Sequence, residues 1–119
     1  MTQEEKQLLL KDLSARVPYG VKVTWDGKYP LTVTPHIYCA IASEDKTDNL
    51  PKLLLRPMSN MTEEESKEFA LLQTDFYVDG ILYPIAAINM VNWLNKKMFD
   101  YNGLIPMGLA LEAPEGMYK

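Results

Sequence analysis

Apolar side chains recur every three or four residues near the N-terminus of the chain. This spacing places them on one face of an α-helix, and the positions are Leu9, Leu10, Leu13 and Val17. Thr2 and Glu5 have the spacing of a capping box, in which each side chain binds the backbone N–H of the other. We therefore predict a helix over residues 2–16. Pro18 and Gly20 end it, because proline disfavours helix in the residue before it and glycine permits the turn.

The next segment alternates apolar and polar positions, as a β-strand does. The apolar positions of its two runs are Val21, Val23 and Trp25, then Leu31, Val33, Ile37, Cys39 and Ile41. Asp26-Gly27 marks a turn between the runs. The apolar positions on both sides are odd-numbered, so we predict a loop of odd length, or a bulge, that places Trp25 near Tyr29. Two prolines interrupt the second run, which makes part of it an edge or a corner.

Two helices are predicted in the second half of the chain. Thr62 with Glu65 forms a capping box, and glutamates fill the first turn, where the helix dipole favours them. In this helix Phe69 and Leu72 are expected to point to the core. The last helix is predicted from Ile85 to Met98, with a buried stripe at Ile85, Ile88, Val91, Leu94 and Met98.

The order of these elements indicates an α+β fold, because strands and helices occur in separate runs without βαβ alternation. We expect one domain over residues 1–119, with an N-terminal helix, a small antiparallel sheet of three to five strands, and two later helices on one face. The sheet includes a short strand over residues 52–56, and residues 76–83 form a second hairpin. The extended C-terminal tail is predicted to lie across the domain from Leu104 to Leu111, with Leu109 and Leu111 inward, as a mainly structural segment.

Composition narrows the possible functions. The net charge is −4, and residues 61–75 alone sum to −4, which argues against non-specific binding to nucleic acid or anionic membrane. Cys39 is the single cysteine, so no internal disulfide forms, as is typical of a reducing cytoplasm. The N-terminus lacks a signal-peptide pattern, and the apolar runs are too short to span a membrane. We expect a soluble, cytoplasmic protein.

The residue types needed for catalysis or for a cofactor are scarce. One histidine and one cysteine give no metal site, and the glycines have no phosphate-loop spacing. Glu64 and Glu68 share a helix face, but a solvated acidic helix start accounts for them better than a carboxylate metal site. In a strand His36 and Cys39 would point to opposite faces, so we interpret Cys39 as a buried small hydrophobe and His36 as a surface residue. We predict no catalytic residue, no metal and no cofactor.

The best candidates for a partner-binding surface are polar or amphipathic residues, namely Arg56, Lys96, Lys97, Asp100 and Tyr101. Met and aromatic residues nearby are typical of protein-binding surfaces. Two alternatives stay open: a small basic-aromatic patch for nucleic acid, and a hydrogen-bonded cluster that only anchors the tail. An enzyme whose site is not visible in the sequence is a third possibility.

Three stretches carry a resemblance to other proteins: "VPYGVKV" (17–23), "LLRPMSNMTEEE" (54–65) and residues 93–119. The chain resembles a group of short uncharacterised proteins from gut bacteria and their phages and mobile elements. That group has no assigned activity, so the resemblance implies only a small accessory protein. From the residues and the resemblance together, we expect a non-catalytic protein that binds another protein or itself.

Overall fold

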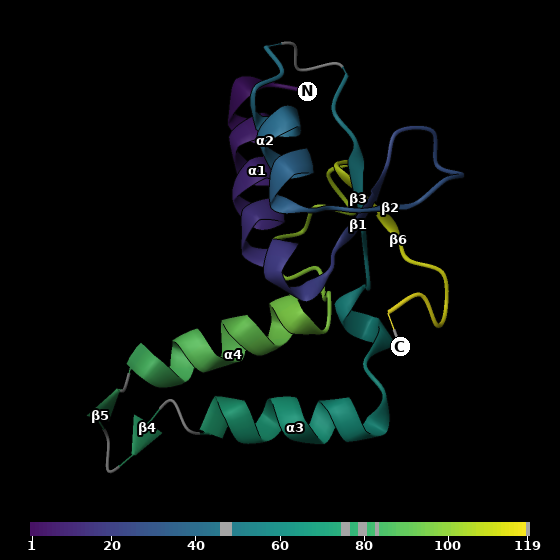
Figure 1. The fold of residues 1–119 in the computed structure, drawn as a ribbon. Helices are drawn as coiled ribbons and strands as arrows, with labels where there is room; N and C mark the ends of the chain where they lie inside the picture. The colour runs from purple at the N-terminus through teal and green to yellow at the C-terminus, as the bar shows by residue number, and fades with distance from the viewer. Residues whose placement is uncertain (46–48, 75–76, 79–80, 83, 119) are drawn as a thin grey trace.

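The computed structural model describes residues 1–45, 49–74, 77–78, 81–82 and 84–118, with only the backbone for 77–78 and 81–82 (Figure 1). Its helices are α1 (Gln3–Arg16), α2 (Pro35–Ala42), α3 (Glu63–Thr74) and α4 (Pro84–Lys96), with short 3-10 turns at η1 (Val17–Tyr19) and η2 (Met58–Asn60). Its strands are β1 (Lys22–Thr24), β2 (Leu31–Thr32), β3 (Lys52–Leu55), β4 (Tyr77–Val78), β5 (Ile81–Leu82) and β6 (Ala110–Glu112). The predicted α+β class is confirmed.

Helix α1 begins as the capping box requires. The backbone N–H of Glu5 donates to Thr2 Oγ1 at 3.1 Å, and the backbone N–H of Thr2 donates to Glu5 Oε1 at 2.8 Å. The helix runs into η1, after which Gly20 adopts a left-handed conformation at φ +80° that glycine reaches without a steric penalty. Both ends of the predicted helix are thus confirmed.

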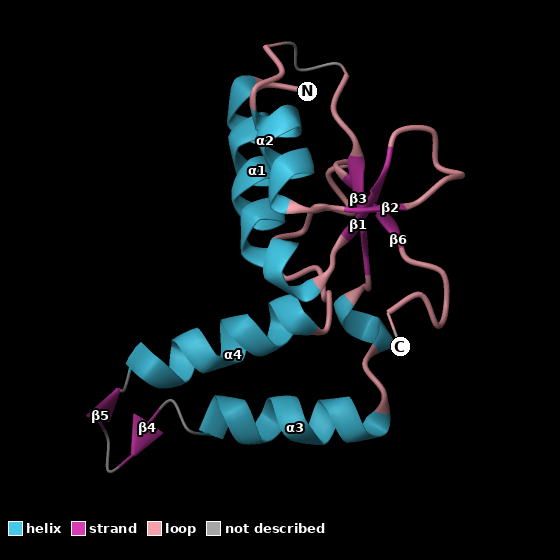
Figure 2. Ribbon diagram, viewed as in Figure 1, coloured by secondary structure: helices cyan, strands magenta, loops and turns pink. Residues whose placement is uncertain are grey.

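Four strands form one sheet in the order β2–β1–β3–β6 (Figure 2). In the β1–β2 pair Val23 lies opposite Leu31, so odd positions face odd positions, as predicted. The loop between them is longer than predicted, and Trp25 and Tyr29 lie beyond the ladder. The sheet is mixed rather than purely antiparallel, because β3 and β6 run parallel. The intervening chain, which includes two helices, supplies the long connection that a parallel pair needs.

Residues 35–42 form helix α2 where the alternating pattern predicted a strand. Thr34 caps the helix by accepting the backbone N–H of Ile37 at 3.2 Å, and Pro35 takes the first helical position, where its missing N–H costs nothing. His36 is exposed as predicted, whereas Cys39 is exposed rather than buried. Their spacing of three residues also places them on one side of the helix, not on opposite faces.

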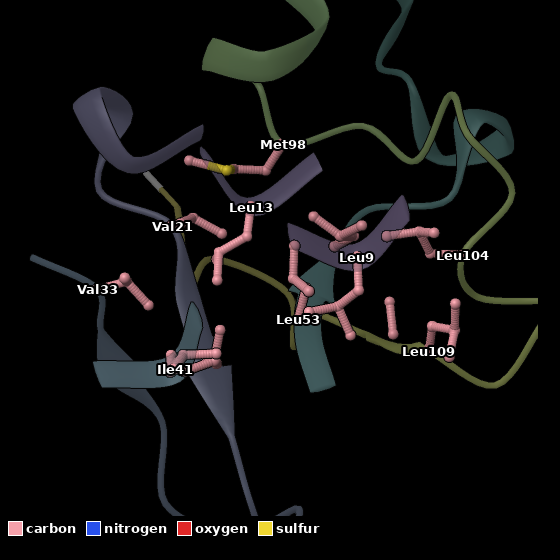
Figure 3. Packing of buried hydrophobic residues seen from close by; sticks show 12 residues of the cluster. Leu9, Leu13, Val21, Val33, Ile41, Leu53, Met98, Leu104 and Leu109 are labelled. Carbon is pink, nitrogen blue, oxygen red and sulfur yellow. The ribbon is translucent and has the colours of Figure 1, made fainter. Parts of the chain in front are cut away.

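The hydrophobic core lies between the sheet and the helices α1 and α2, which cover the same side of it (Figures 1 and 3). Leu9 and Leu13 from α1 and Leu53 and Leu55 from β3 are fully buried there. Leu104 also reaches this core, from the segment before β6. Segments from both ends of the chain therefore share one core, as expected for a single folding unit.

Helices α3 and α4 pack side by side and project from this body as a helical hairpin, which we call the arm (Figure 1). The Phe69 and Trp93 rings stack between them at 5.8 Å, and Trp93 stacks on Phe99 at the same distance. The predicted burial of Ile85 and Ile88 is wrong, since they are 61% and 53% exposed. The outer half of α4 extends past the body, which leaves part of its apolar stripe uncovered.

The second hairpin joins the two helices of the arm. Strands β4 and β5 pair antiparallel, with Val78 opposite Ile81. The predicted hairpin is confirmed in the backbone, whereas its turn at Asp79-Gly80 lies outside the described residues.

The C-terminal tail is only partly extended. Residues 104–108 form turns, and β6 pairs with β3. Leu109 is buried as predicted. The second buried residue is Ala110, whereas Leu111, which was predicted to point inward, is half-buried. The sequence pattern failed here because two glycines, Gly103 and Gly108, adopt φ +74° and +77° and turn the backbone.

Candidate functional site

A cleft of about 770 Å³ lies where the arm joins the body. The first turns of α3 form one wall, the last residues of α4 and the following turn form another, and residues 113–118 form the third. Its lining includes three of the five predicted partner-binding residues, namely Arg56, Lys96 and Lys97. The volume falls in the range of ligand-binding clefts in proteins.

Arg56 and Glu65 form a two-pronged ion pair on the cleft wall. Arg56 Nη1 donates to Glu65 Oε2 at 2.8 Å, and Nη2 donates to Oε1 at 2.6 Å. Glu65 Oε1 also accepts the backbone N–H of Thr62 at 3.0 Å, while the Glu65 N–H donates to Thr62 Oγ1 at 3.1 Å. This confirms the predicted capping box of α3, and the same carboxylate that caps the helix binds the guanidinium.

The ion pair changes the acidity of Glu65. Hydrogen bonds from the Arg56 guanidinium, with a smaller contribution from the Thr62 N–H, lower the pKa of Glu65 from 4.5 to about 2, although partial burial opposes the shift. A general acid or base needs a pKa near the working pH. Glu65 is shifted in the opposite direction, so it is a fixed anion whose geometry is set by Arg56.

Arg56 also joins the arm to the sheet. Its backbone N–H donates to Met98 O at 2.7 Å, and its carbonyl accepts the N–H of Asp100 at 2.8 Å. Its guanidinium lies 4.2 Å from the centre of the Phe99 ring, a cation–π contact. The segment after α4 therefore forms an isolated parallel β-bridge between Phe99 and Arg56, and the base of the arm is held by both backbone and side chain.

Lys96 and Lys97 supply the unpaired positive charges of the cleft. Among the described residues, the ion pairs include neither of their ammonium groups. The same lining contains the carboxylates of Glu64, Glu68 and Glu115, of which Glu68 accepts a hydrogen bond from Trp93 Nε1 at 2.9 Å. The cleft therefore presents charges of both signs around a neutralised Arg56–Glu65 pair.

Asp100 and Tyr101 do not line the cleft. The Asp100 carboxylate accepts the backbone N–H groups of Leu104 at 2.8 Å and Ile105 at 2.9 Å, which fixes the turn that leads into the tail. The Tyr101 hydroxyl donates to Asn95 Oδ1 at 2.7 Å, and burial raises its pKa. Both contacts are those of a structural hydrogen-bonded cluster, the alternative that the sequence left open for this part of the set.

A buried ion pair behind this cluster was not predicted. Arg16 Nε donates to Asp12 Oδ1 at 2.6 Å, and Arg16 Nη2 donates to the carbonyl of Phe99 at 2.7 Å. Asn102 Nδ2 donates to the other Asp12 oxygen at 2.7 Å, and the guanidinium lies 5.1 Å from the Tyr101 ring centre. The signal in the sequence was an Asp and an Arg four residues apart on the apolar side of α1.

Tyr118 fastens the end of the chain to the sheet. Its hydroxyl accepts the backbone N–H of Lys22 at 3.0 Å and donates to Leu54 O at 2.6 Å. Lys22 and Leu54 adjoin the last paired residues of the β1–β3 ladder, Val23 opposite Leu53, so the hydroxyl bridges the two strands next to their last backbone pair. Burial raises the pKa of Tyr118 to about 12.

Within the described part of the chain, no group of three His, Cys, Asp or Glu residues is arranged to hold a metal ion, and no helix is long and apolar enough to cross a membrane. Comparison with protein-family models, curated proteins and solved structures found no match.

Proposed function

We propose that this protein is a non-catalytic binding module that holds an extended peptide segment of a partner protein in the cleft at the base of the arm. One observation carries the proposal: Lys96 and Lys97 line the same cleft as Glu64, Glu68 and Glu115, around the fixed Arg56–Glu65 pair. A peptide with neighbouring acidic and basic side chains would complement both walls.

The chemistry of the cleft favours binding over catalysis. The described residues that line it include neither histidine nor cysteine, the residues that most often serve as base or nucleophile near neutral pH. Among the described residues of the lining, Glu65 is the carboxylate with a strongly shifted pKa, and the shift is downward, which keeps it ionised rather than available for proton transfer. The charged lining of the cleft and its fixed Arg56–Glu65 pair suit the binding of a charged ligand.

The charges also favour a peptide over nucleic acid. Lys96 and Lys97 share the cleft lining with the carboxylates of Glu64, Glu68 and Glu115. Those carboxylates would repel a phosphate backbone, which needs several unopposed cations for tight binding. A peptide segment brings both signs and avoids this repulsion.

An accessory role in the cytoplasm of a bacterium or an infected cell is part of this proposal. The sequence resemblance to short proteins of gut bacteria and their phages supports the setting. The exposed, unpaired thiol of Cys39 supports a reducing compartment.

Selection from a random peptide library displayed on phage tests the proposal. The wild-type chain should enrich peptides in which an acidic residue lies within a few positions of a basic one. The Lys96→Glu/Lys97→Glu variant should lose at least about tenfold in affinity for them, because each lost charge contact costs about 1 kcal/mol or more. Lys11→Glu/Lys28→Glu is the matched control, since it makes the same charge change at exposed lysines outside the cleft.

Three results would contradict the proposal. The first is the absence of any enriched peptide, and the second is equal binding by the cleft variant and the control. The third is tighter binding of a single-stranded oligothymidine than of any selected peptide, measured by fluorescence anisotropy, which would favour nucleic acid instead.

A further inference from the structure

Glu68 differs from the other unpaired carboxylates of the cleft because a hydrogen bond fixes its side chain. Trp93 Nε1 donates to Glu68 Oε2 at 2.9 Å. Glu64 and Glu115 line the same cleft, but within the described part of the chain their side chains take part in no hydrogen bond or ion pair. Among the described residues of the lining, Glu68 is thus the carboxylate that is held in position without being neutralised by a cation.

The hydrogen bond joins the two helices of the arm at the edge of the cleft. Glu68 follows Glu64 by four residues, so both lie on the face of α3 that lines the cleft. Trp93 precedes Lys97 by four residues, and the Lys97 N–H donates to the Trp93 carbonyl at 3.0 Å, as in a continuous helix. The indole therefore lies one turn further from the body than Lys97 and on the same side of α4.

Aromatic contacts fix the indole that makes this bond. The Trp93 ring is stacked on Phe69 with the ring planes 20° apart and on Phe99 with the planes 23° apart. Phe99 is fully buried, and its ring also contacts the guanidinium of Arg56. Rotation of the Trp93 side chain would break both stacking contacts. The direction of the indole N–H, and with it the position of the Glu68 carboxylate, is therefore set by the packing of the arm.

The second oxygen of this carboxylate is open to a ligand. Within the described residues Glu68 Oε1 takes part in no hydrogen bond or ion pair, and the side chain is exposed. Glu65 cannot take this role, because Arg56 already binds both of its oxygens at 2.8 and 2.6 Å. A carboxylate that is held in place loses less conformational freedom on binding than one that must first be ordered. Its complementary partner is an ammonium or guanidinium group.

We propose that Glu68 binds the basic side chain of the peptide and that Trp93 positions its carboxylate for this contact. The inference rests on the proposed function, since it names the residue that recognises the positive charge of the peptide in the same cleft. Glu68 is then the residue that determines the selectivity for a basic side chain, and Trp93 is a positioning residue that does not itself touch the peptide.

A hydrogen bond that only joined α3 to α4 would have different consequences. Its loss would lower the stability of the arm and weaken the binding of every peptide by the same factor. A positioning role instead changes the preference for a peptide with a basic residue over the same peptide without it. The ratio of these two affinities therefore distinguishes the two roles, because a general loss of stability cancels in it.

The experiment uses the tightest peptide from the displayed library and an analogue with norleucine, an uncharged straight-chain residue, in place of its basic residue. Fluorescence anisotropy gives both dissociation constants, and the wild-type chain should prefer the charged peptide by at least about tenfold. Glu68→Gln keeps an oxygen for the indole but removes the charge, so this preference should fall to about twofold or less. Trp93→Phe keeps a ring in the stack but removes the donor, and the preference should fall at least about threefold. Circular dichroism and thermal melting verify that the variants fold.

Two further substitutions on α3 serve for comparison. Glu63→Gln is the matched control, because Glu63 is outside the cleft lining and its side chain is 90% exposed; its preference should equal that of the wild-type chain. Glu64→Gln removes the same charge one turn before Glu68 within the cleft, at a carboxylate that no hydrogen bond fixes. It should lower the preference less than Glu68→Gln does.

Nuclear magnetic resonance gives a direct signature of the contact. The two tryptophans, Trp25 and Trp93, each give an indole N–H signal, and Trp25→Phe assigns them. A cation bound to Glu68 changes the charge at the acceptor of the Trp93 hydrogen bond. The charged peptide should therefore shift the Trp93 signal more than the norleucine analogue does.

The outcomes separate this inference from the proposed function. A preference that is the same in Glu68→Gln as in the wild-type chain, or an equal loss in Glu64→Gln, would refute the role of Glu68 while peptide binding in the cleft stands. An unchanged preference in Trp93→Phe, or a Trp93 signal that responds equally to both peptides, would refute the positioning role. The absence of any enriched peptide would contradict the proposed function itself, and this inference with it.

Discussion

Replacing Glu65 by glutamine tests the ion pair that holds the base of the arm. Glutamine keeps the size of the side chain and is also found at this position of a capping box, so the substitution removes mainly the charge. The lowering of the pKa from 4.5 to about 2 corresponds to about 3 kcal/mol of stabilisation when each unit is taken as 1.36 kcal/mol. We expect Glu65→Gln to lower the free energy of unfolding by about 2–3 kcal/mol at pH 7.

The pH dependence distinguishes this charge effect from a packing defect. The pKa of Glu65 is lower in the folded chain than in the unfolded chain, so the unfolded chain takes up the proton first as the pH falls. The stabilisation is complete above about pH 4.5 and is lost as the pH falls to about 2. The difference between the wild-type chain and Glu65→Gln should therefore shrink by about 2 kcal/mol between pH 5 and pH 3.

Urea denaturation at a series of pH values measures this difference. At pH 7 the midpoint of Glu65→Gln should lie about 1–2 M below that of the wild-type chain. Glu63→Gln is the control in the same helical turn, because its side chain is 90% exposed and lies 3.9 Å from Lys67; its midpoint should equal that of the wild-type chain. A difference that stays constant from pH 7 to pH 3 would refute the reasoning.

Three further predictions concern the anchoring of the two ends of the chain. Tyr118→Phe removes the hydroxyl between β1 and β3 and should lower the free energy of unfolding by about 1–3 kcal/mol. Because the pKa of Tyr118 is raised from 10 to about 12 in the folded chain, the stabilisation by this hydroxyl should be lost between pH 10 and pH 12. An absorbance titration of tyrosine, run beside alkaline denaturation, measures this loss. Asp12→Ala leaves the fully buried Arg16 without its anion and should cost about 3–5 kcal/mol by urea denaturation, whereas adding Arg16→Leu should restore much of the loss. Deleting residues 104–119 removes part of the core and strand β6. Each buried leucine contributes about 2–5 kcal/mol, whereas a domain has about 5–15 kcal/mol of stability in total, so the cooperative melting transition should be lost in calorimetry. An unchanged transition would mean that the tail is a docking surface.

Local signals predicted local structure well in this chain. The capping boxes at Thr2 and Thr62 gave the starts of α1 and α3, because a cap depends on residues only three positions apart. Helix α2 differs from the predicted strand although it has a similar signal. Thr34-Pro35 is an N-cap followed by proline, and the alternating apolar residues after it matched the strand pattern over a segment too short to distinguish the two periods.

Features that depend on distant segments could not be read from the pattern. The parallel pairing of β6 with β3 joins a three-residue strand to a partner more than fifty positions earlier. The exposure of Ile85 and Ile88 depends on how far the arm projects from the body. The helical period predicts which residues share a face, but it does not predict whether another segment covers that face. The bridge by Tyr118 joins three segments through one hydroxyl, and the tail carries no motif for it.

The candidate site shows the same contrast between local signals and contacts of distant segments. Arg56, Lys96 and Lys97 meet at the cleft, and their role in binding a partner stays a prediction. Their association could not be derived from the sequence, because it needs the turn after β3 and the end of α4 to converge. The sequence predicts Asp100 and Tyr101 on the same surface, but their hydrogen bonds place them in the structural cluster behind it.

The contacts of Arg56 connect the stability of the arm to the proposed binding site. Its guanidinium binds Glu65 on α3, while its backbone binds the segment after α4. The walls of the cleft are thereby fixed before any peptide arrives, which reduces the ordering cost of binding. Loss of the pair should weaken stability and peptide affinity together, whereas reversal of Lys96 and Lys97 should weaken affinity alone. A Glu65→Gln chain with normal affinity would show that the two are not coupled.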